Sequence, residues 1–160
     1  MKNINFKGLF LTALNVIASF FFSFYLTSTL ANNTDALNLV ANVFSILSGF
    51  LLLVITMSGE NSILNSALSK NDKVNQTVRF EMRFNKYYSL FLIYIFTLAL
   101  IFVYYLLSKD TVHDKMIIDV MKKYLGYCIS FLTFFAFVQS TFIPMKIKDL
   151  FKEKRDLSGS

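Results

Sequence analysis

The stretch Ala36–Gly59, ALNLVANVFSILSGFLLLVITMSG, contains no Asp, Glu, Lys, Arg or His. As a helix rising about 1.5 Å per residue, it is long enough to cross the ~30 Å hydrocarbon core of a bilayer. Gly8–Leu30, Tyr87–Leu107 and Tyr124–Pro144 share these properties. Because hydrocarbon offers no water to unpaired backbone groups, each stretch should be helical throughout. The sequence therefore predicts an all-α, polytopic membrane protein with four transmembrane helices.

The composition of the 160-residue chain agrees with this fold class, since 55% of the residues are hydrophobic and the mean hydropathy is +0.53. The charged residues lie in the connections, and no connection is long enough to form a globular domain of its own. We therefore expect a single transmembrane domain over 1–157, with a cytoplasmic helical hairpin at 60–86 and a basic amphipathic tail at 145–157. The terminal residues 158–160 resemble an artificial linker and carry no functional interpretation.

The distribution of basic residues predicts the orientation, because cytoplasmic flanks of spans carry an excess of Lys and Arg. Twelve of the 16 Lys and Arg residues fall on one side of the predicted spans: Lys2, Lys7, Lys70, Lys73, Arg79, Arg83, Lys86, Lys146, Lys148, Lys152, Lys154 and Arg155. The other side holds Lys109, Lys115, Lys122 and Lys123. Both termini are therefore expected in the cytoplasm. The uncharged run near the N-terminus is longer than a signal-peptide core, which favours an uncleaved first span.

Small and polar residues recur at helical spacing inside three of the spans. In the second span Asn38, Asn42, Ser45 and Gly49 follow at steps of four, three and four, which places them on one face. The first span contains Thr12, Asn15, Ser19 and Ser23, and the fourth contains Gly126, Ser130, Thr133 and Gln139.

Two interpretations of these faces remain open. Small residues permit close helix packing and interhelical hydrogen bonds, inside a bundle or between subunits. Alternatively, Asn15, Asn38, Asn42 and Gln139 line an aqueous path. No span contains an ionisable Asp, Glu, Lys, Arg or His, which argues against a proton-coupled transporter, an ion pump or a voltage sensor.

The third span differs, because Leu90–Leu107 is almost entirely large and apolar. It is expected to face lipid, with Tyr87 and Tyr88 at one end and Tyr104 and Tyr105 at the other as interfacial aromatic belts.

The segment Glu60–Lys86 has helical hydrophobic spacing on both sides of Asn71-Asp72, which predicts two helical arms joined by a turn there. The arms either pack on each other or form a docking surface for a cytosolic protein. The tail either lies on anionic headgroups of the inner leaflet or binds the same partner. The candidate docking residues are Lys70, Lys73, Arg79, Arg83, Lys86, Lys152, Lys154 and Arg155.

No catalytic motif is present in the sequence, and we expect a protein that is not an enzyme and needs no cofactor. The single cysteine, Cys128, is interpreted as a small core residue, and the single histidine, His113, as a solvated side chain rather than a metal ligand. The basic residues are spread over three segments, so direct binding of nucleic acid is not expected.

The residues Ser45–Phe50 (SILSGF) and Ser58–Glu60 (SGE), together with the four-span layout, resemble the membrane subunits of bacterial antiphage systems, most closely those of Kiwa systems. The resemblance implies a homo-oligomeric sensor in the bacterial inner membrane that detects phage attachment and engages a cytosolic DNA-binding effector. A holin-like or depolarising pore-former is the alternative function, and a passive assembly subunit is a third. These hypotheses predict different partners and different effects on the membrane.

Overall fold

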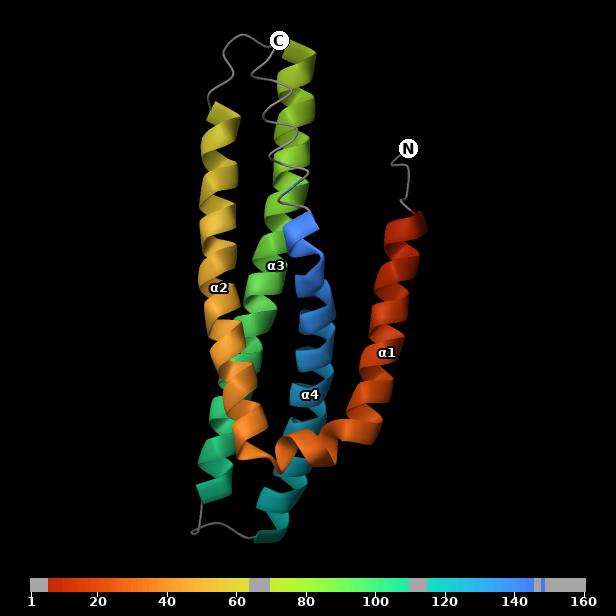
Figure 1. The fold of residues 1–160 in the computed structure, drawn as a ribbon, viewed down its shortest axis with the longest axis vertical. Coiled ribbons are helices and arrows are strands. Elements are labelled where there is room, and N and C mark those ends of the chain that lie inside the picture. The colour runs from red at the N-terminus through yellow and green to blue at the C-terminus, as the bar shows by residue number, and fades with distance from the viewer. Residues whose placement is uncertain (1–5, 64–69, 110–114, 146–147, 149–160) are drawn as a thin grey trace.

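The computed structural model describes residues 6–63, 70–109, 115–145 and 148. The elements in this part of the chain are four helices (Figure 1): α1 (Phe6–Ala31), α2 (Thr34–Ile63), α3 (Lys70–Lys109) and α4 (Lys115–Thr141). The prediction of an all-helical fold is confirmed. The candidate spans within these helices are Gly8–Ala31, Thr34–Thr56, Phe84–Lys109 and Lys115–Met145.

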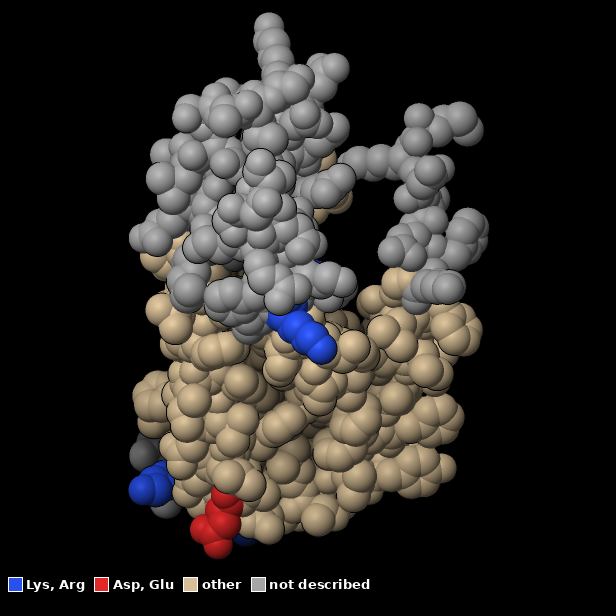
Figure 2. Space-filling model, turned by 45° about the horizontal axis from the view of Figure 1, so that its top comes forward, with Lys and Arg blue, Asp and Glu red and all other residues tan. Residues whose placement is uncertain are grey.

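The surface of the four spans is largely apolar, which indicates that lipid rather than water surrounds it. Only 17–28% of the residues in the most apolar window of each span are buried. Figure 2 shows a broad uncharged surface between charged side chains near its two ends. Exposed side chains such as Phe10, Phe24 and Ile46 would leave a large apolar area in water. Length, composition and exposure together indicate a multi-pass membrane protein.

A two-residue connection, Asn32–Asn33, turns the chain between the first two helices. The amide of Ala36 donates to Asn33 Oδ1 at 3.0 Å, so Asn33 caps the N-terminus of α2. Asp35 lies in the first turn of α2, where a carboxylate interacts favourably with the helix dipole. At the other end of the chain α4 ends at Thr141, and after a turn at Phe142 residues 143–145 are helical again, with Pro144 in the first turn of this segment, where its missing amide hydrogen is tolerated. Short connections and local caps therefore set these helix ends.

The four helices run in alternating directions and pack in the order α2, α3, α4, α1. The helix α1 lies along α4 and meets α2 mainly where the two are joined (Figure 1). The start of α1, the end of α2, the start of α3 and the end of α4 therefore lie toward the same end of the molecule.

The apolar core lies mainly between α2 and α3, with α4 closing one side. Phe44 of α2 is fully buried, and its ring centroid lies 4.9 Å from that of Tyr94 and 5.5 Å from that of Phe137. The phenol of Tyr94 is hydrogen-bonded to Ser140 Oγ at 2.5 Å, which links α3 to α4. Aromatic stacking and one interhelical hydrogen bond thus hold three helices together at this level.

The expectation that the third span faces lipid holds for one side of α3, where Leu92, Phe96 and Phe102 are exposed; its other sides pack against α2 and α4. Tyr87 and Tyr104 are 5% and 7% exposed, so they do not form an interfacial belt. The Tyr104 hydroxyl donates to the carbonyl of Ala31 at 2.9 Å and satisfies a group at the C-terminus of α1. Tyr87 and Tyr104 are buried because α3 is one of the two inner helices of the row and has a neighbour on each side.

The helices α2 and α3 continue beyond their spans, to Ile63 and back to Lys70 respectively. Asn71-Asp72, predicted as the turn between the two arms, lies within the first turn of α3 instead, which begins at Lys70. Residues 64–69, part of the predicted hairpin, lie outside the described residues. The position of this extension on the cytoplasmic side stays a prediction.

Replacing Phe44 with Ala should lower the free energy of unfolding in detergent by about 3–5 kcal/mol, because it opens a cavity beside Tyr94 and Phe137. The matched control is Ile46→Ala on the same helix, where the side chain is 72% exposed and little should change. The measurement is an SDS-titration unfolding curve. Equal losses in the two variants would contradict the packing described here.

Candidate functional site

The helix α1 is polar on its buried face and apolar elsewhere. Asn15, Ser19, Ser23 and Thr27 recur every four residues and are all at most 8% exposed. On the other sides of α1, large side chains such as Phe20, Phe21 and Phe24 are more than 60% exposed. These four buried residues, together with Gly126 of α4, are called the α1–α4 seam.

Hydrogen bonds across the α1–α4 seam set its register. Asn15 Nδ2 donates to the carbonyl of Phe135 at 3.2 Å, and Ser23 Oγ donates to the carbonyl of Tyr127 at 2.9 Å. From Asn15 to Ser23 the donor moves eight residues forward along α1, and the accepting carbonyl moves eight residues back along α4. Two antiparallel helices require this relation. A slip by one residue would bring apolar α1 side chains against these carbonyls.

Two hydroxyls in the seam bond within α1 itself. Ser19 Oγ donates to the carbonyl of Asn15 at 2.7 Å, and Thr27 Oγ1 donates to the carbonyl of Ser23. Back-bonding of this kind often bends a helix. Figure 1 shows α1 bent toward its C-terminal end, so that its last turns run across α4.

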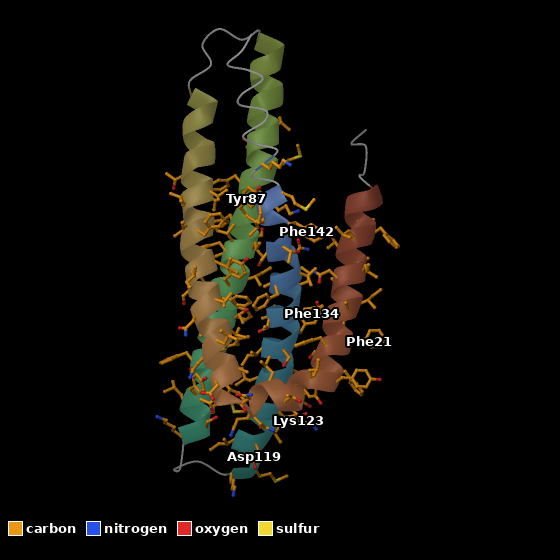
Figure 3. The ribbon with its side chains drawn as sticks, viewed as in Figure 1. Phe21, Tyr87, Asp119, Lys123, Phe134 and Phe142 are labelled. Carbon is orange, nitrogen blue, oxygen red and sulfur yellow. The ribbon has the colours of Figure 1, made fainter. Side chains whose placement is uncertain are left out.

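Gly126 allows the two helices to approach each other. A Cβ at this position would lie 3.2 Å from Thr27 Cγ2 and 3.3 Å from Ala31 Cβ. Aromatic pairs flank the contact, with ring centroids 4.8 Å apart in both Phe20–Phe131 and Phe22–Phe134. Figure 3 shows Phe134 between α4 and α1, whereas Phe21 points away from the bundle. The seam is therefore a close polar contact between aromatic walls.

Some buried polar atoms of α1 and α4 have no hydrogen-bond partner among the described residues: Asn15 Oδ1, Ser130 Oγ and Thr133 Oγ1. Ser48 Oγ of α2 is in the same situation. Native structures leave few such groups, because each one costs free energy that a partner would recover. At the α1–α4 seam, Asn15 Oδ1 is therefore a buried acceptor that the present arrangement does not use.

The second set of predicted residues lies on a different surface. Asn38, Asn42, Ser45 and Gly49, here called the α2 polar face, are all exposed. A Cβ added at Gly49 would meet nothing within 4 Å. Asn38 Oδ1 accepts a hydrogen bond of 2.9 Å from the hydroxyl of Tyr105. Apart from this hydrogen bond between Asn38 and α3, the α2 polar face is exposed on the outside of the protomer.

The structure brings Asn15 and Ser19 together in the α1–α4 seam but does not bring them to Asn38 or Asn42. Gln139 of α4 is half-buried. Because Asn15 is buried and Asn42 is exposed, the four residues proposed to line a path do not surround one route within a protomer. Any path between them would need several copies of the chain.

The candidate docking residues lie largely outside the described side chains. Lys86 is exposed on α3. Lys70, Lys73, Arg79 and Arg83 belong to the backbone of α3, but their side chains are outside the described part. Lys152, Lys154 and Arg155 are outside it altogether.

The opposite end of the bundle carries its own charges. Asp119 and Lys123 of α4 lie there (Figure 3). Lys122 Nζ is 5.7 Å from the centroid of the Tyr104 ring, within the range of a cation–π interaction. Lys115–Lys123, which precede the predicted fourth span, form the first turns of α4.

Sequence reasoning missed Thr27 and the Tyr94–Ser140 hydrogen bond. Thr27 continues the four-residue interval of Asn15, Ser19 and Ser23, so extending that interval by one step would have found it. The Tyr94–Ser140 pair has no comparable signal, because it depends on which helices become neighbours.

Replacing Gly126 with Leu should destabilise the protomer by about 1–3 kcal/mol, since the new side chain overlaps Thr27 and Ala31. Gly49→Leu is the control, because it makes the same change on a helix where space is open; it should be neutral or slightly stabilising. Thermal unfolding in detergent measures both. Equal stability of the two variants would contradict the close approach of α1 and α4.

Among the described residues, no three His, Cys, Asp or Glu side chains gather as a metal site would require. No protein-family model, no curated protein and no solved structure matches the chain. The proposal for its function therefore rests on its residues and their geometry.

Proposed function

We propose that this protein is a non-enzymatic, homo-oligomeric membrane sensor and anchor that recruits or regulates a cytosolic effector. The observation that carries the proposal is the α1–α4 seam, a polar helix contact in which the buried Asn15 Oδ1 has no hydrogen-bond partner among the described residues. The resemblance to Kiwa membrane subunits supports a role in antiphage defence at the bacterial inner membrane, with both termini in the cytoplasm.

The energetics of the seam suit a sensor. Polar interhelical contacts in membranes contribute only about 0.6–2 kcal/mol each. The helix α1 packs mainly on α4, and its other sides are apolar and remain stable in lipid. A perturbation of the bilayer therefore needs to supply only a few kcal/mol to favour a second arrangement of α1.

The continuation of α2 and α3 beyond their spans supports a docking role for that end of the protein. Lys70, Lys73, Arg79, Arg83 and Lys86 all belong to the first half of α3. A basic surface at this end attracts both anionic headgroups and an acidic face of a protein. Repacking of α1 would reach the effector through α4 and α3, which lie side by side.

The double variant Arg79→Glu/Arg83→Glu should lose the effector, because charge reversal replaces attraction with repulsion. The measurement is purification from native membranes in mild detergent, with mass spectrometry of co-eluting proteins. Lys109→Glu/Lys115→Glu is the matched control, since it reverses the same charge at the opposite end of the helices and should retain the effector. Full retention in the Arg79/Arg83 variant would refute this docking site.

A depolarising or holin-like pore is the second candidate, and the exposure of the α2 polar face favours it. Asn42 is exposed within a span, where an amide would be stabilised by water in a channel between subunits. Several copies would then arrange Asn38 and Asn42 around a common axis.

Membrane potential distinguishes the two functions. For a sensor, overexpression without the effector should leave a potential-sensitive dye signal unchanged. For a pore, the dye should report rapid depolarisation, and Asn38→Leu/Asn42→Leu should abolish it by removing the polar lining. Depolarisation that this variant abolishes would overturn the sensor.

A further inference from the structure

The helix α2 has three distinct faces within its span. The buried face packs into the core through residues such as Leu37, Phe44 and Leu51. The α2 polar face lies on a second side, and Leu52 and Thr56 continue its steps of three and four residues. A third face is exposed and entirely apolar, with Leu39, Ile46, Phe50 and Leu53.

The apolar face shows how this helix meets lipid. Leu39, Ile46 and Leu53 are 63%, 72% and 56% exposed, and such side chains are stable in hydrocarbon without any partner. The α2 polar face is also exposed, and its one printed interhelical hydrogen bond joins Asn38 to Tyr105, yet it carries two amides and a glycine. An amide facing lipid is costly, so the two faces are suited to different neighbours.

One polar group on this face stands out. Ser45 Oγ donates to the carbonyl of Ala41 at 2.8 Å and Thr56 Oγ1 donates to the carbonyl of Leu52 at 2.9 Å, so both hydroxyls are satisfied within α2. Tyr105 bonds to Asn38. The side-chain amide of Asn42 has no hydrogen-bond partner among the described residues. The face is therefore suited to close packing, with a single amide that needs a partner.

We propose that the α2 polar face is the contact between two copies of this chain, in which the two α2 helices cross as a parallel, two-fold pair and Asn42 bonds to Asn42 of the second copy. This proposal rests on the homo-oligomer of the proposed function and names the surface that forms it.

Self-complementarity makes a second copy the natural occupant. Copies inserted with the same topology present α2 in parallel, and a two-fold axis then places each residue opposite itself. A carboxamide has both donor and acceptor atoms, so two Asn42 side chains satisfy each other, as a buried Asn does in a coiled coil.

The spacing of the face fits the same geometry. Steps of four and three from Asn38 to Thr56 match the seam of left-handed helix pairs, which cross at about +20° in membranes. These residues span about 27 Å of helix rise, close to the hydrocarbon thickness. Gly49, with open space around it, permits close approach of the second helix. The contact would therefore run the length of the span.

Disulfide cross-linking in native membranes tests the proposal. In a Cys128→Ser background, which removes the natural thiol, Ser45→Cys should form a covalent dimer with copper phenanthroline because facing positions bring their Cβ atoms within bonding range. Ile46→Cys is the matched control, since the adjacent side chain lies on the apolar face and should stay monomeric. Absence of the Ser45→Cys dimer, or equal cross-linking of the control, overturns the proposal.

Second-site variants then test the contacts themselves. Adding Gly49→Leu or Asn42→Leu to the Ser45→Cys protein should abolish the cross-link while thermal unfolding of the protomer in detergent stays unchanged. Persistence of the cross-link in both variants would contradict the pairing. Cross-linking to a different protein, or rapid reaction of Ser45→Cys with a water-soluble thiol reagent, would show another partner or a pore and would also overturn it.

The outcome separates this inference from the proposed function. A Ser45→Cys dimer in a protein that recruits no effector would support the α2 contact and refute the sensor role. Conversely, the protein could recruit its effector while its oligomer survives Gly49→Leu and Ser45→Cys forms no dimer. That result would support the sensor role and refute the α2 contact.

Discussion

The absence of hydrogen-bonding solvent in hydrocarbon is the constraint on which the rest of this structure depends. Every polar side chain in a span must find its partner in the same helix, in a neighbouring helix or in another molecule. The helix α1 meets this requirement by turning Asn15, Ser19, Ser23 and Thr27 toward α4, while large apolar side chains such as Phe10, Phe21 and Phe24 are exposed. The result is a helix whose polarity is the reverse of that in a water-soluble bundle.

The two polar faces of the protein solve the same problem differently. The α1–α4 seam is buried inside one protomer, where Asn15 and Ser23 bond to carbonyls of α4. The α2 polar face is left open because Phe44 and its neighbours direct the opposite side of α2 into the core. One face therefore holds the protomer together, and the other is available for assembly. A weak polar seam beside an aromatic core is also compatible with the proposed repacking of α1, which would need only a small free-energy difference between two arrangements.

Much of the fold could be predicted from the sequence. Uncharged segments identified the four spans, and helical spacing grouped Asn15 with Ser19 and Asn42 with Ser45. Spacing could not tell which of these groups is buried, since both are compatible with helix packing. The burial of Tyr87 and Tyr104 in α3 was not predicted for a related reason: a hydrophobic helix can be stable in lipid or in a core, and only its neighbours decide which of its sides is buried. Tyr104 can be buried because its hydroxyl donates a hydrogen bond to the carbonyl of Ala31.

The chain by itself determines its solvent, its helices and the faces on which polar residues gather, because these depend on local composition and on the period of the helix. The tertiary structure alone decides that α3 and α4 are the inner helices, that α1 packs on α4, and that Asn42 has no hydrogen-bond partner among the described residues. Those outcomes follow from side-chain fit between segments far apart in the sequence, such as Gly126 against Thr27 and Tyr94 against Ser140. Hydrophobic periodicity carries no information about that fit.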